Sequence, residues 1–476
     1  SVVAPEADPA PDPGRRGVLR SVRDTWGVLT RRYPLRGIET LLLAAFVLLF
    51  FLPARLVYLP MGAEGRPATL LGVGLFIVWC LGKLVPHLAP RGRQPLRIAL
   101  WVFVGVLLLS WLAGLDRGPL PVETLAMDRT IVARLSIVGL ALVMADGVRT
   151  RRSLDRLLVG LVYCGGFMGL VAFLQFALKI DIVPNLKFPP FAFNSELVGS
   201  RIRGEGLRVS STAGHSIELG VVAAMLVPIA HHYVLRAGTN NQRIFRLLVA
   251  GLLVASIAFA GSRAGFVGLA VAGVTMAWGW SSRARLQGLA LMVFGLVAFK
   301  ALLPGLMGTI RYLFLNFGSD DSITGRTDDY EVIFDYIRTR PILGRGPGSF
   351  VPSEYLVLDN EYLYSAVTIG LVGLLALGVI VVIALMQSGW VAHHARTNEA
   401  RHLGQALKAS ILVGVAASAT FDSMSFATFT SVWFILMGAT AALWRIERDG
   451  PDTEIDAAAR DDFSQVVASS RLTDPS

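Results

Sequence analysis

The chain has 476 residues, of which 54% are hydrophobic and 16% charged, and its formal net charge is +10 with a mean hydropathy of +0.58. This composition excludes an ordinary soluble protein, because several apolar runs reach the roughly 18 to 20 residues that cross a bilayer. We therefore predict an all-α, polytopic integral membrane protein. The basic residues cluster between the apolar runs, which indicates membrane orientation and no nucleic-acid partner. Cys80 and Cys164 fall in different apolar runs and predict small buried hydrophobes, with no disulfide framework and no metal site.

The two ends of the chain are polar. Residues 1–37 are rich in Pro, Ala and Arg and lack a core-forming pattern, so they predict a disordered basic tail without a signal peptide. Residues 445–476 predict a second loose tail.

About twelve transmembrane helices are predicted between these tails from the lengths of the apolar runs. Nine fall within residues 38–303 and three within residues 361–444, and a large polar loop, residues 304–360, separates helices 9 and 10. The predicted spans are Ile38–Leu52, Ala68–His87, Leu96–Leu115, Thr130–Ala145, Leu154–Leu178, His215–Leu235, Leu247–Gly261, Ala264–Trp280, Leu286–Leu303, Glu361–Gln387, Leu403–Phe421 and Phe426–Trp444.

The loops between the spans alternate in charge. Basic residues occupy the first tail and every second loop, and the positive-inside rule assigns that side to the cytoplasm. Both termini are then cytoplasmic, whereas Lys179–Gly214, the turn at Arg263 and residues 304–360 are extracytoplasmic. The basic groups are Arg15/Arg16/Arg20/Arg23/Arg31/Arg32/Arg36, Arg91/Arg93/Arg97, Arg149/Arg151/Arg152/Arg156, Arg236/Arg243/Arg246, Arg283/Arg285 and Arg396/Arg401/Lys408.

Arg263 stands in a minimal outer turn of small residues, Gly261-Ser262-Arg263-Ala264-Gly265, which lets backbones and ligands approach closely. A planar guanidinium binds phosphate oxygens through two hydrogen bonds, so Arg263 is a candidate anion ligand. A snorkelling membrane anchor is the alternative. Arg208, before the sixth span, and Arg326, in the large loop, are candidates for the same anion.

The large outer loop contains a predicted amphipathic helix over Thr327–Arg340, which Pro341 ends. Its apolar residues at helical spacing are Tyr330, Ile333, Phe334 and Ile337. This helix either lies on the membrane surface with its apolar face down or acts as a brace. The glycine-rich run Gly344–Gly348 that follows either cradles an anion or makes a tight turn.

Asp359 directly precedes the tenth span. A carboxylate at this border is a candidate general base, if partial desolvation raises its pKa toward the working pH. A helix N-cap, supported by Asn360 or Glu361, is the alternative. His215, at the start of the sixth span, is a reserve base, and Glu218 follows it by one turn.

Several short motifs, taken in chain order, resemble the O-antigen ligase/polymerase superfamily. They are Arg208…Thr212-Ala-Gly214-His215, Ser262-Arg263-Ala264-Gly265, Gly325-Arg326-Thr327, Pro341-Ile-Leu-Gly344-Arg-Gly346-Pro347-Gly348-Ser-Phe350, and Asn360-Glu-Tyr362-Leu363 followed by Gly370-Leu-Val-Gly373-Leu374. The resemblance covers about residues 205–375 in motif and about 38–444 in topology.

The resemblance implies a metal-independent, inverting glycosyltransferase without a cofactor, at the outer face of a bacterial inner membrane. Its donor is a glycan on a polyprenyl (undecaprenyl) diphosphate, and its acceptor is a glycan or glycolipid. Residues matching Arg263 and Arg326 hold the donor diphosphate in the family, and we expect Arg208 to assist them. Asp359 stands where the family has a catalytic histidine, and we expect it to replace that base. Asn360, Tyr362, Glu218 and Arg345 are expected as supporting residues.

Two other classes remain open. A transporter or flippase for lipid-linked oligosaccharides predicts ionisable residues near the bilayer midplane or broken half-helices in related repeats. A non-catalytic envelope assembly protein is favoured if Asp359 only caps a helix.

Overall fold

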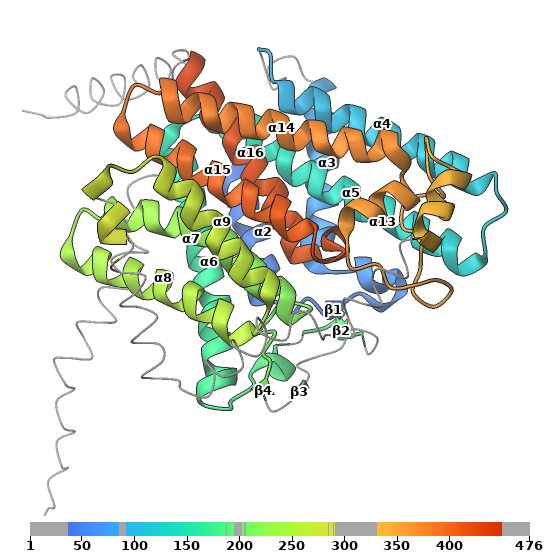
Figure 1. Cartoon of the computed structure of the whole chain (residues 1–476), viewed down its shortest axis with the longest axis horizontal. Coiled ribbons are helices and arrows are strands. Elements are labelled where there is room, and N and C mark those ends of the chain that lie inside the picture. The colour runs from blue at the N-terminus through green and yellow to red at the C-terminus, as the bar shows by residue number, and fades with distance from the viewer. Residues whose placement is uncertain are drawn as a thin grey trace, which may run out of the picture.

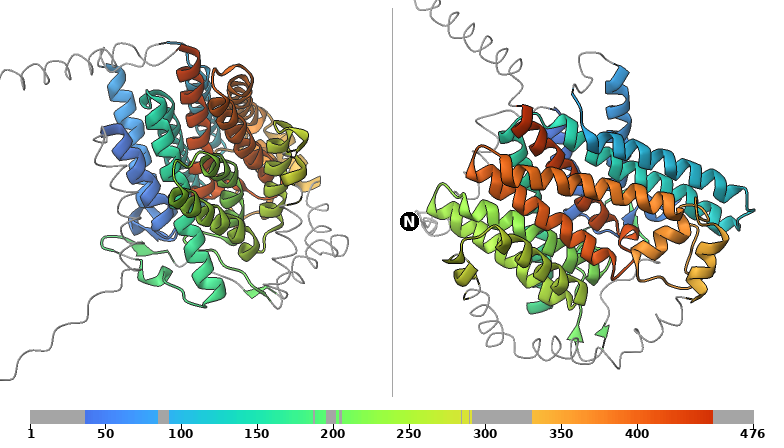
Figure 2. Two further views of the ribbon diagram at one scale, coloured as in Figure 1. Left: turned by 90° about the vertical axis from the view of Figure 1, so that its left-hand side faces the viewer. Right: turned by 45° about the horizontal axis from the view of Figure 1, so that its top comes forward.

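The computed structural model describes residues 37–84, 92–186, 188–194, 202–203, 206–283, 285–288, 290 and 331–449. Long helices, packed side by side, make up most of this part of the chain (Figures 1 and 2). Four sequence predictions lie outside the described residues: the N-terminal tail through residue 36, nearly all of the predicted ninth span, the outer loop through residue 330, and the C-terminal tail from residue 450.

The described helices coincide with eleven of the twelve predicted spans. They are α2 (Gly37–Phe51), α3 (Pro67–Leu84), α4 (Pro95–Leu115), α5 (Pro121–Gly147), α6 (Arg151–Ala177), α7 (Ser216–Leu235), α8 (Asn240–Ala260), α9 (Arg263–Trp278), α13 (Glu361–Thr368), α14 (Gly370–His394), α15 (Asn398–Ser418) and α16 (Ala427–Asp449). Within the described ranges, eight are long and apolar enough to cross a membrane, while α2 and α9 are shorter apolar helices. The chain is therefore a mostly helical, multi-pass membrane protein, as predicted.

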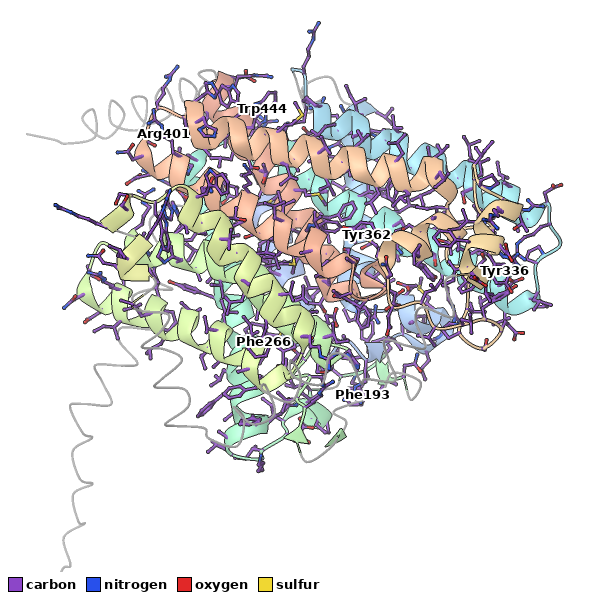
Figure 3. All side chains as sticks on the ribbon, in the orientation of Figure 1. Phe193, Phe266, Tyr336, Tyr362, Arg401 and Trp444 are labelled. Carbon is purple, nitrogen blue, oxygen red and sulfur yellow. The ribbon has the colours of Figure 1, made fainter. Side chains whose placement is uncertain are left out.

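The long helices lie side by side, so the bundle has two distinct ends (Figure 2). At the end predicted to be cytoplasmic, ion pairs join Arg156 to Glu39, Arg151 to Glu447 and Arg236 to Glu399. Figure 3 shows Arg401 and Trp444 at this end, and Phe193, Phe266 and Tyr336 toward the other. We call that other end the loop end, because the longest described connections lie there.

Short strands tie the loops of the loop end together. Strand β1 (Leu56–Val57) pairs antiparallel with β2 (Ala192–Phe193), and β3 (Ile202–Arg203) pairs antiparallel with β4 (Gly206–Leu207). A 3-10 turn, η1 (Leu59–Glu64), leads from β1 to α3, and two more, η2 (Val183–Asn185) and η3 (Ser423–Ser425), lie in connections at the same end.

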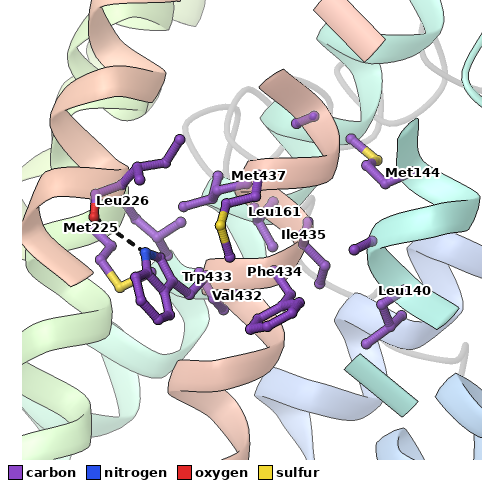
Figure 4. Packing of buried hydrophobic residues seen from close by; sticks show 14 of the residues in the cluster. Leu140, Met144, Leu161, Met225, Leu226, Val432, Trp433, Phe434, Ile435 and Met437 are labelled. Carbon is purple, nitrogen blue, oxygen red and sulfur yellow. Dashed lines mark hydrogen bonds between the residues drawn. The ribbon is translucent and has the colours of Figure 1, made fainter. Parts of the chain in front are cut away.

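The core is centred on α16, which is buried along nearly its whole length. In Figure 4 the Trp433 indole points toward α15, where its Nε1–H donates to the Ile411 carbonyl oxygen at 3.2 Å. This bond satisfies the one polar atom of a fully buried aromatic side chain, and the rest of the ring contributes apolar packing. The central helix therefore has a fixed rotation and height within the bundle.

The predicted span Glu361–Gln387 is in fact two helices, α13 and α14, which meet at a bend at Ile369 and Gly370. Gly370 has φ +70°, and a Cβ there would lie 2.2 Å from the Ile342 carbonyl oxygen. That carbonyl accepts from Val372 N–H, and Arg345 N–H donates to the Val367 carbonyl. The bend exists because the loop after residue 340 inserts its backbone against it, a tertiary contact that periodicity does not reveal.

The amphipathic helix of the large loop is present over residues 331–339. Ile333 is buried in a small apolar cluster with Phe350 and Leu358, whereas Phe334 is 48% exposed. One side of the helix therefore braces the loop against α13.

Candidate functional site

Glu218 joins the starts of two helices at the loop end. It lies in the first turn of α7, is 1% exposed, and accepts from Gly214 N–H through Oε2 at 2.7 Å. Its Oε1 accepts from the backbone N–H groups of Thr428 and Phe429, in the first turn of α16, at 2.7 and 3.1 Å. A carboxylate at a helix N-terminus satisfies N–H groups that have no partner within the helix. Glu218 therefore sets the position of α7 against α16.

His215 is the N-cap of α7. Its Nδ1 accepts from Ile217 N–H at 3.1 Å, and its ring lies 6.1 Å from the Phe426 ring. Because Nδ1 is an acceptor in this cap, a neutral His215 carries its proton on Nε2. In this tautomer Nε2 is a donor, which suits the side chain less to the role of base.

Two of the three predicted outer arginines lie at the turn between α8 and α9. The Arg208 side chain passes over Gly261, and an added Cβ at Gly261, which has φ +55°, would lie 3.6 Å from the Cγ and Nε atoms of Arg208. Arg263 is the first residue of α9, whose N-cap, Ser262, makes no side-chain capping hydrogen bond.

Small residues hold this turn against α7. A Cβ at Gly265 would lie 3.1 Å from the Cα and C atoms of Gly220, so the two backbones touch. The Ser-Arg-Ala-Gly motif thus brings the N-terminus of α9 next to the first turns of α7. A helix N-terminus with an arginine at its first position is suited to an anion.

Asp359 is not the cap of α13. That role belongs to Asn360, whose Oδ1 accepts from the N–H groups of Tyr362 and Leu363 at 2.9 and 3.3 Å. Asp359 lies one residue earlier and is half-buried. The capping explanation for Asp359 is therefore wrong, because its neighbour performs that function.

A clamp formed by Glu361 and Arg134 fixes the η3 turn. Glu361, 2% exposed, accepts from Met424 N–H at 2.8 Å and from the Ser365 hydroxyl at 2.6 Å. Arg134, 9% exposed within α5, donates from a terminal guanidinium nitrogen to the Met424 carbonyl oxygen at 2.8 Å. The backbone N–H and C=O of Met424 are thus both held, by opposite charges from two different helices.

The clamp places a second carboxyl group, Asp422, near Asp359. Burial raises the pKa of Asp422 to about 7, and the negative charges of Glu361 and Asp359 act in the same direction, while a hydrogen bond to Ser425 opposes them. Asp422 therefore changes protonation close to neutral pH, the range in which proton transfer between an enzyme and its substrate is most efficient.

The remaining predicted residues have structural contacts or lie outside the described residues. Tyr362 donates its hydroxyl to the Val415 carbonyl oxygen at 2.6 Å and so joins α13 to α15. Arg345 donates to the Tyr355 hydroxyl at 2.8 Å and lies over the Tyr336 ring. Arg326 lies outside the described residues.

The glycine-rich run makes a tight turn. Gly344 has φ +69°, and a Cβ there would lie 2.5 Å from both Gly370 N and the Thr368 carbonyl oxygen. Gly346 N–H donates to that same Thr368 oxygen at 2.9 Å. The turn is packed against the α13–α14 bend, so its conformation is explained without an anion.

Sequence reasoning missed Arg134 and Asp422 as site residues. Arg134 is an arginine inside an apolar run, a costly placement that usually marks a pairing or a function. Asp422 is a carboxyl group in the short turn between two spans. Both signals are visible in the sequence, but the contact that unites them, through Met424, is not. Among the described residues, no group of three or more His, Cys, Asp or Glu side chains could hold a metal ion.

Comparison with known families gives one match. Residues 248–378 match a family model described as O-antigen ligase, a range that begins in α8 and ends in α14. It includes the Arg263 turn and the carboxyl group of Asp359, and it confirms the resemblance found in the motifs. A search of curated proteins gave no match.

Proposed function

We propose that this chain, whose residues 248–378 match the O-antigen ligase family model, is an inverting glycosyltransferase of cell-envelope polysaccharide assembly. Its donor is a glycan on a polyprenyl diphosphate, and its acceptor is a hydroxyl group of a glycan or glycolipid. The reaction takes place at the loop end, which faces out of the bacterial inner membrane, and it uses no metal ion. The observation that carries the proposal is the gathering of Arg208, Arg263 and Asp359 at this one end, within and beside the matched segment.

The donor diphosphate binds at the start of α9. Arg263 and Arg208 supply guanidinium groups, and the N-terminus of α9 adds partial positive charge from its backbone N–H groups. Arg326 is proposed as a third cation from the large loop. His215 donates from Nε2 to the same ligand. These groups stabilise the diphosphate most strongly when it leaves as an anion, which is the charge that develops in the transition state.

The acceptor hydroxyl is activated by the carboxylate of Asp359. Its oxygen attacks the anomeric carbon from the face opposite the diphosphate, and a new carbon–oxygen bond forms as the bond to the diphosphate oxygen breaks. The hydroxyl proton passes to Asp359, and the diphosphate leaves with its electron pair. Inversion of the anomeric configuration follows from this single displacement.

Asp422 supports the same step. With a pKa of about 7, it is able to take up and release a proton near neutral pH, so it returns the Asp359 proton to water between turnovers. Its position depends on the clamp at Met424, which makes Glu361 and Arg134 positioning residues. Glu218 positions α7 and therefore His215.

The test is glycan transfer by purified variants supplied with a lipid-diphosphate-linked glycan and an acceptor. Arg263→Ala should lower the rate by about 100-fold or more, on the scale seen for loss of one group that stabilises transition-state charge. Asp359→Asn should abolish turnover while donor binding remains. Matched controls are Arg338→Ala and Asp335→Asn, which alter an exposed ion pair on the helix at residues 331–339 and should leave the rate unchanged. Unimpaired transfer by Arg263→Ala would refute the diphosphate role.

A further inference from the structure

A polar cavity of about 120 Å³ lies beside the clamp, and Arg134 and Met424 form part of its wall. It is lined by the start of α3 with the end of η1, by the middle of α5, by Tyr364 of α13, and by the turn leading into α16 with the start of that helix. For comparison, one water needs about 10–15 Å³ of the same measure. The cavity therefore has space for several waters or for a small hydroxyl-rich molecule.

Two arginines and one glutamate line the cavity, namely Arg66, Arg134 and Glu64. Arg66 uses its Nε–H to bind the Ala54 carbonyl oxygen at 2.7 Å, and Arg134 uses one terminal nitrogen at Met424. Within the described part of the chain, the other guanidinium nitrogens of Arg134 make no hydrogen bond, although this side chain is 9% exposed. The lining thus carries one net positive charge with several donors available.

Three buried residues with hydroxyl groups line the same space. Thr69, Ser136 and Ser431 line the cavity and are 7%, 2% and 6% exposed. In the ranges that the structure describes, none of these hydroxyls has a hydrogen-bond partner. Buried polar groups normally find a partner, in protein, water or ligand. Three hydroxyls in one cavity indicate a ligand, or waters that a ligand replaces.

The composition of the lining selects among ligands. Glu64 disfavours an inorganic anion, but its carboxylate accepts hydrogen bonds from hydroxyl groups. The arginines favour one negative charge, and the Tyr364 ring adds an apolar wall. Hydroxyl groups, one negative charge and an apolar face occur together in an acidic sugar residue.

The cavity adjoins the turn that carries Asp422. Its wall includes Met424 and Ser425, which follow Asp422 in the chain, whereas His215 lies against Phe426, on the α7 side of that turn. We propose that the cavity binds one anionic sugar residue of the acceptor and so presents the neighbouring hydroxyl to Asp359. This inference rests on the proposed glycosyl transfer, because it names the acceptor's chemistry at that site.

The experiment measures binding and transfer separately, with the full chain in lipid nanodiscs. Ligand-observed NMR monitors a titration with glucuronate. This sugar should bind saturably and at least tenfold more tightly than glucose does. Arg66→Gln should remove that preference, and the nearly isosteric variants Thr69→Val and Ser431→Ala should weaken both sugars. Arg338→Gln, on the exposed helix, is the control and should bind like the wild type.

The transfer arm separates the two proposals. With an acidic acceptor, Thr69→Val and Ser431→Ala should raise the KM for the acceptor at least fivefold, while kcat and the rate of donor hydrolysis by water stay near wild type. Saturable sugar binding without any transfer would contradict the proposed function and leave the cavity as a sugar site. Normal acceptor KM in both variants, absence of glucuronate binding, or equal competition by inorganic phosphate would overturn the inference.

Discussion

The Glu218→Gln variant tests whether the Glu218 carboxylate has a structural role or a catalytic one. Glutamine has nearly the same shape, but it keeps a single oxygen, and Glu218 uses both of its oxygens for backbone N–H groups of two helix starts. In the variant the side-chain NH2 group must therefore face either Gly214 N–H or the N–H groups of Thr428 and Phe429. Because all of these groups are donors, at least one backbone N–H loses its hydrogen bond.

The expected loss of stability follows from these contacts. A hydrogen bond to a charged acceptor contributes about 1.5–3 kcal/mol, and a buried N–H left without a partner costs about 1–3 kcal/mol. Because the two figures overlap in part, we expect a loss of roughly 2–4 kcal/mol in the free energy of unfolding. Catalysis should survive, because no proton transfer passes through Glu218.

The assay combines thermal unfolding of the purified protein with glycan transfer measured well below the unfolding temperature. Glu331→Gln, an exposed change on the helix at residues 331–339, is the control. A stability within about 0.5 kcal/mol of wild type, the range of neutral surface changes, would refute the role of Glu218 as a joint. Complete loss of transfer at normal stability would instead make Glu218 the base.

Three further outcomes are expected. The transfer rate should rise with pH through about 7, because ionised Asp422 accepts the proton. Glu361→Gln should shift this rise to lower pH, because it removes a like charge that raises the pKa of Asp422. An unchanged pH profile would contradict this coupling between Glu361 and Asp422. Gly370→Ala should lower the melting temperature, because a Cβ would meet the Ile342 carbonyl oxygen at 2.2 Å; the same change at Gly378, where a Cβ meets nothing within 4 Å, is the control. Cysteine in place of exposed Ser353 should react with impermeant reagents from outside the cell; protection would reverse the orientation.

Long apolar runs predicted the membrane helices well, because helix length and bilayer thickness are linked directly. The same reasoning placed the start of one span at Thr130, whereas α5 begins at Pro121. There Glu123 accepts from Leu120 N–H at 2.7 Å and pairs with Arg117 at 2.8 Å. Local caps and ion pairs extended the helix into a polar segment that hydropathy assigned to a loop.

The sequence predicted several residues of the candidate site, but it did not predict the contacts between them. The motifs pointed to Arg208, Arg263 and Asp359, but they did not distinguish Asp359 from the cap, which Asn360 provides. Neither Arg134 nor Asp422 was predicted as a site residue. Glu361 and Arg134 both bind the backbone of Met424, close to Asp422 in the chain, and Met424 lies more than 60 residues after Glu361. Contacts of this kind depend on the packed fold and leave no periodic pattern.

The most direct test of the central claim is to follow both products of one reaction in proteoliposomes. The wild-type chain, given a polyprenyl-diphosphate-linked glycan and an acidic acceptor, should release one polyprenyl diphosphate for each glycosylated acceptor, with the anomeric configuration inverted. Asp359→Asn should give neither product. Movement of an intact donor across the bilayer, without cleavage of its glycan, would contradict the account and identify a transporter.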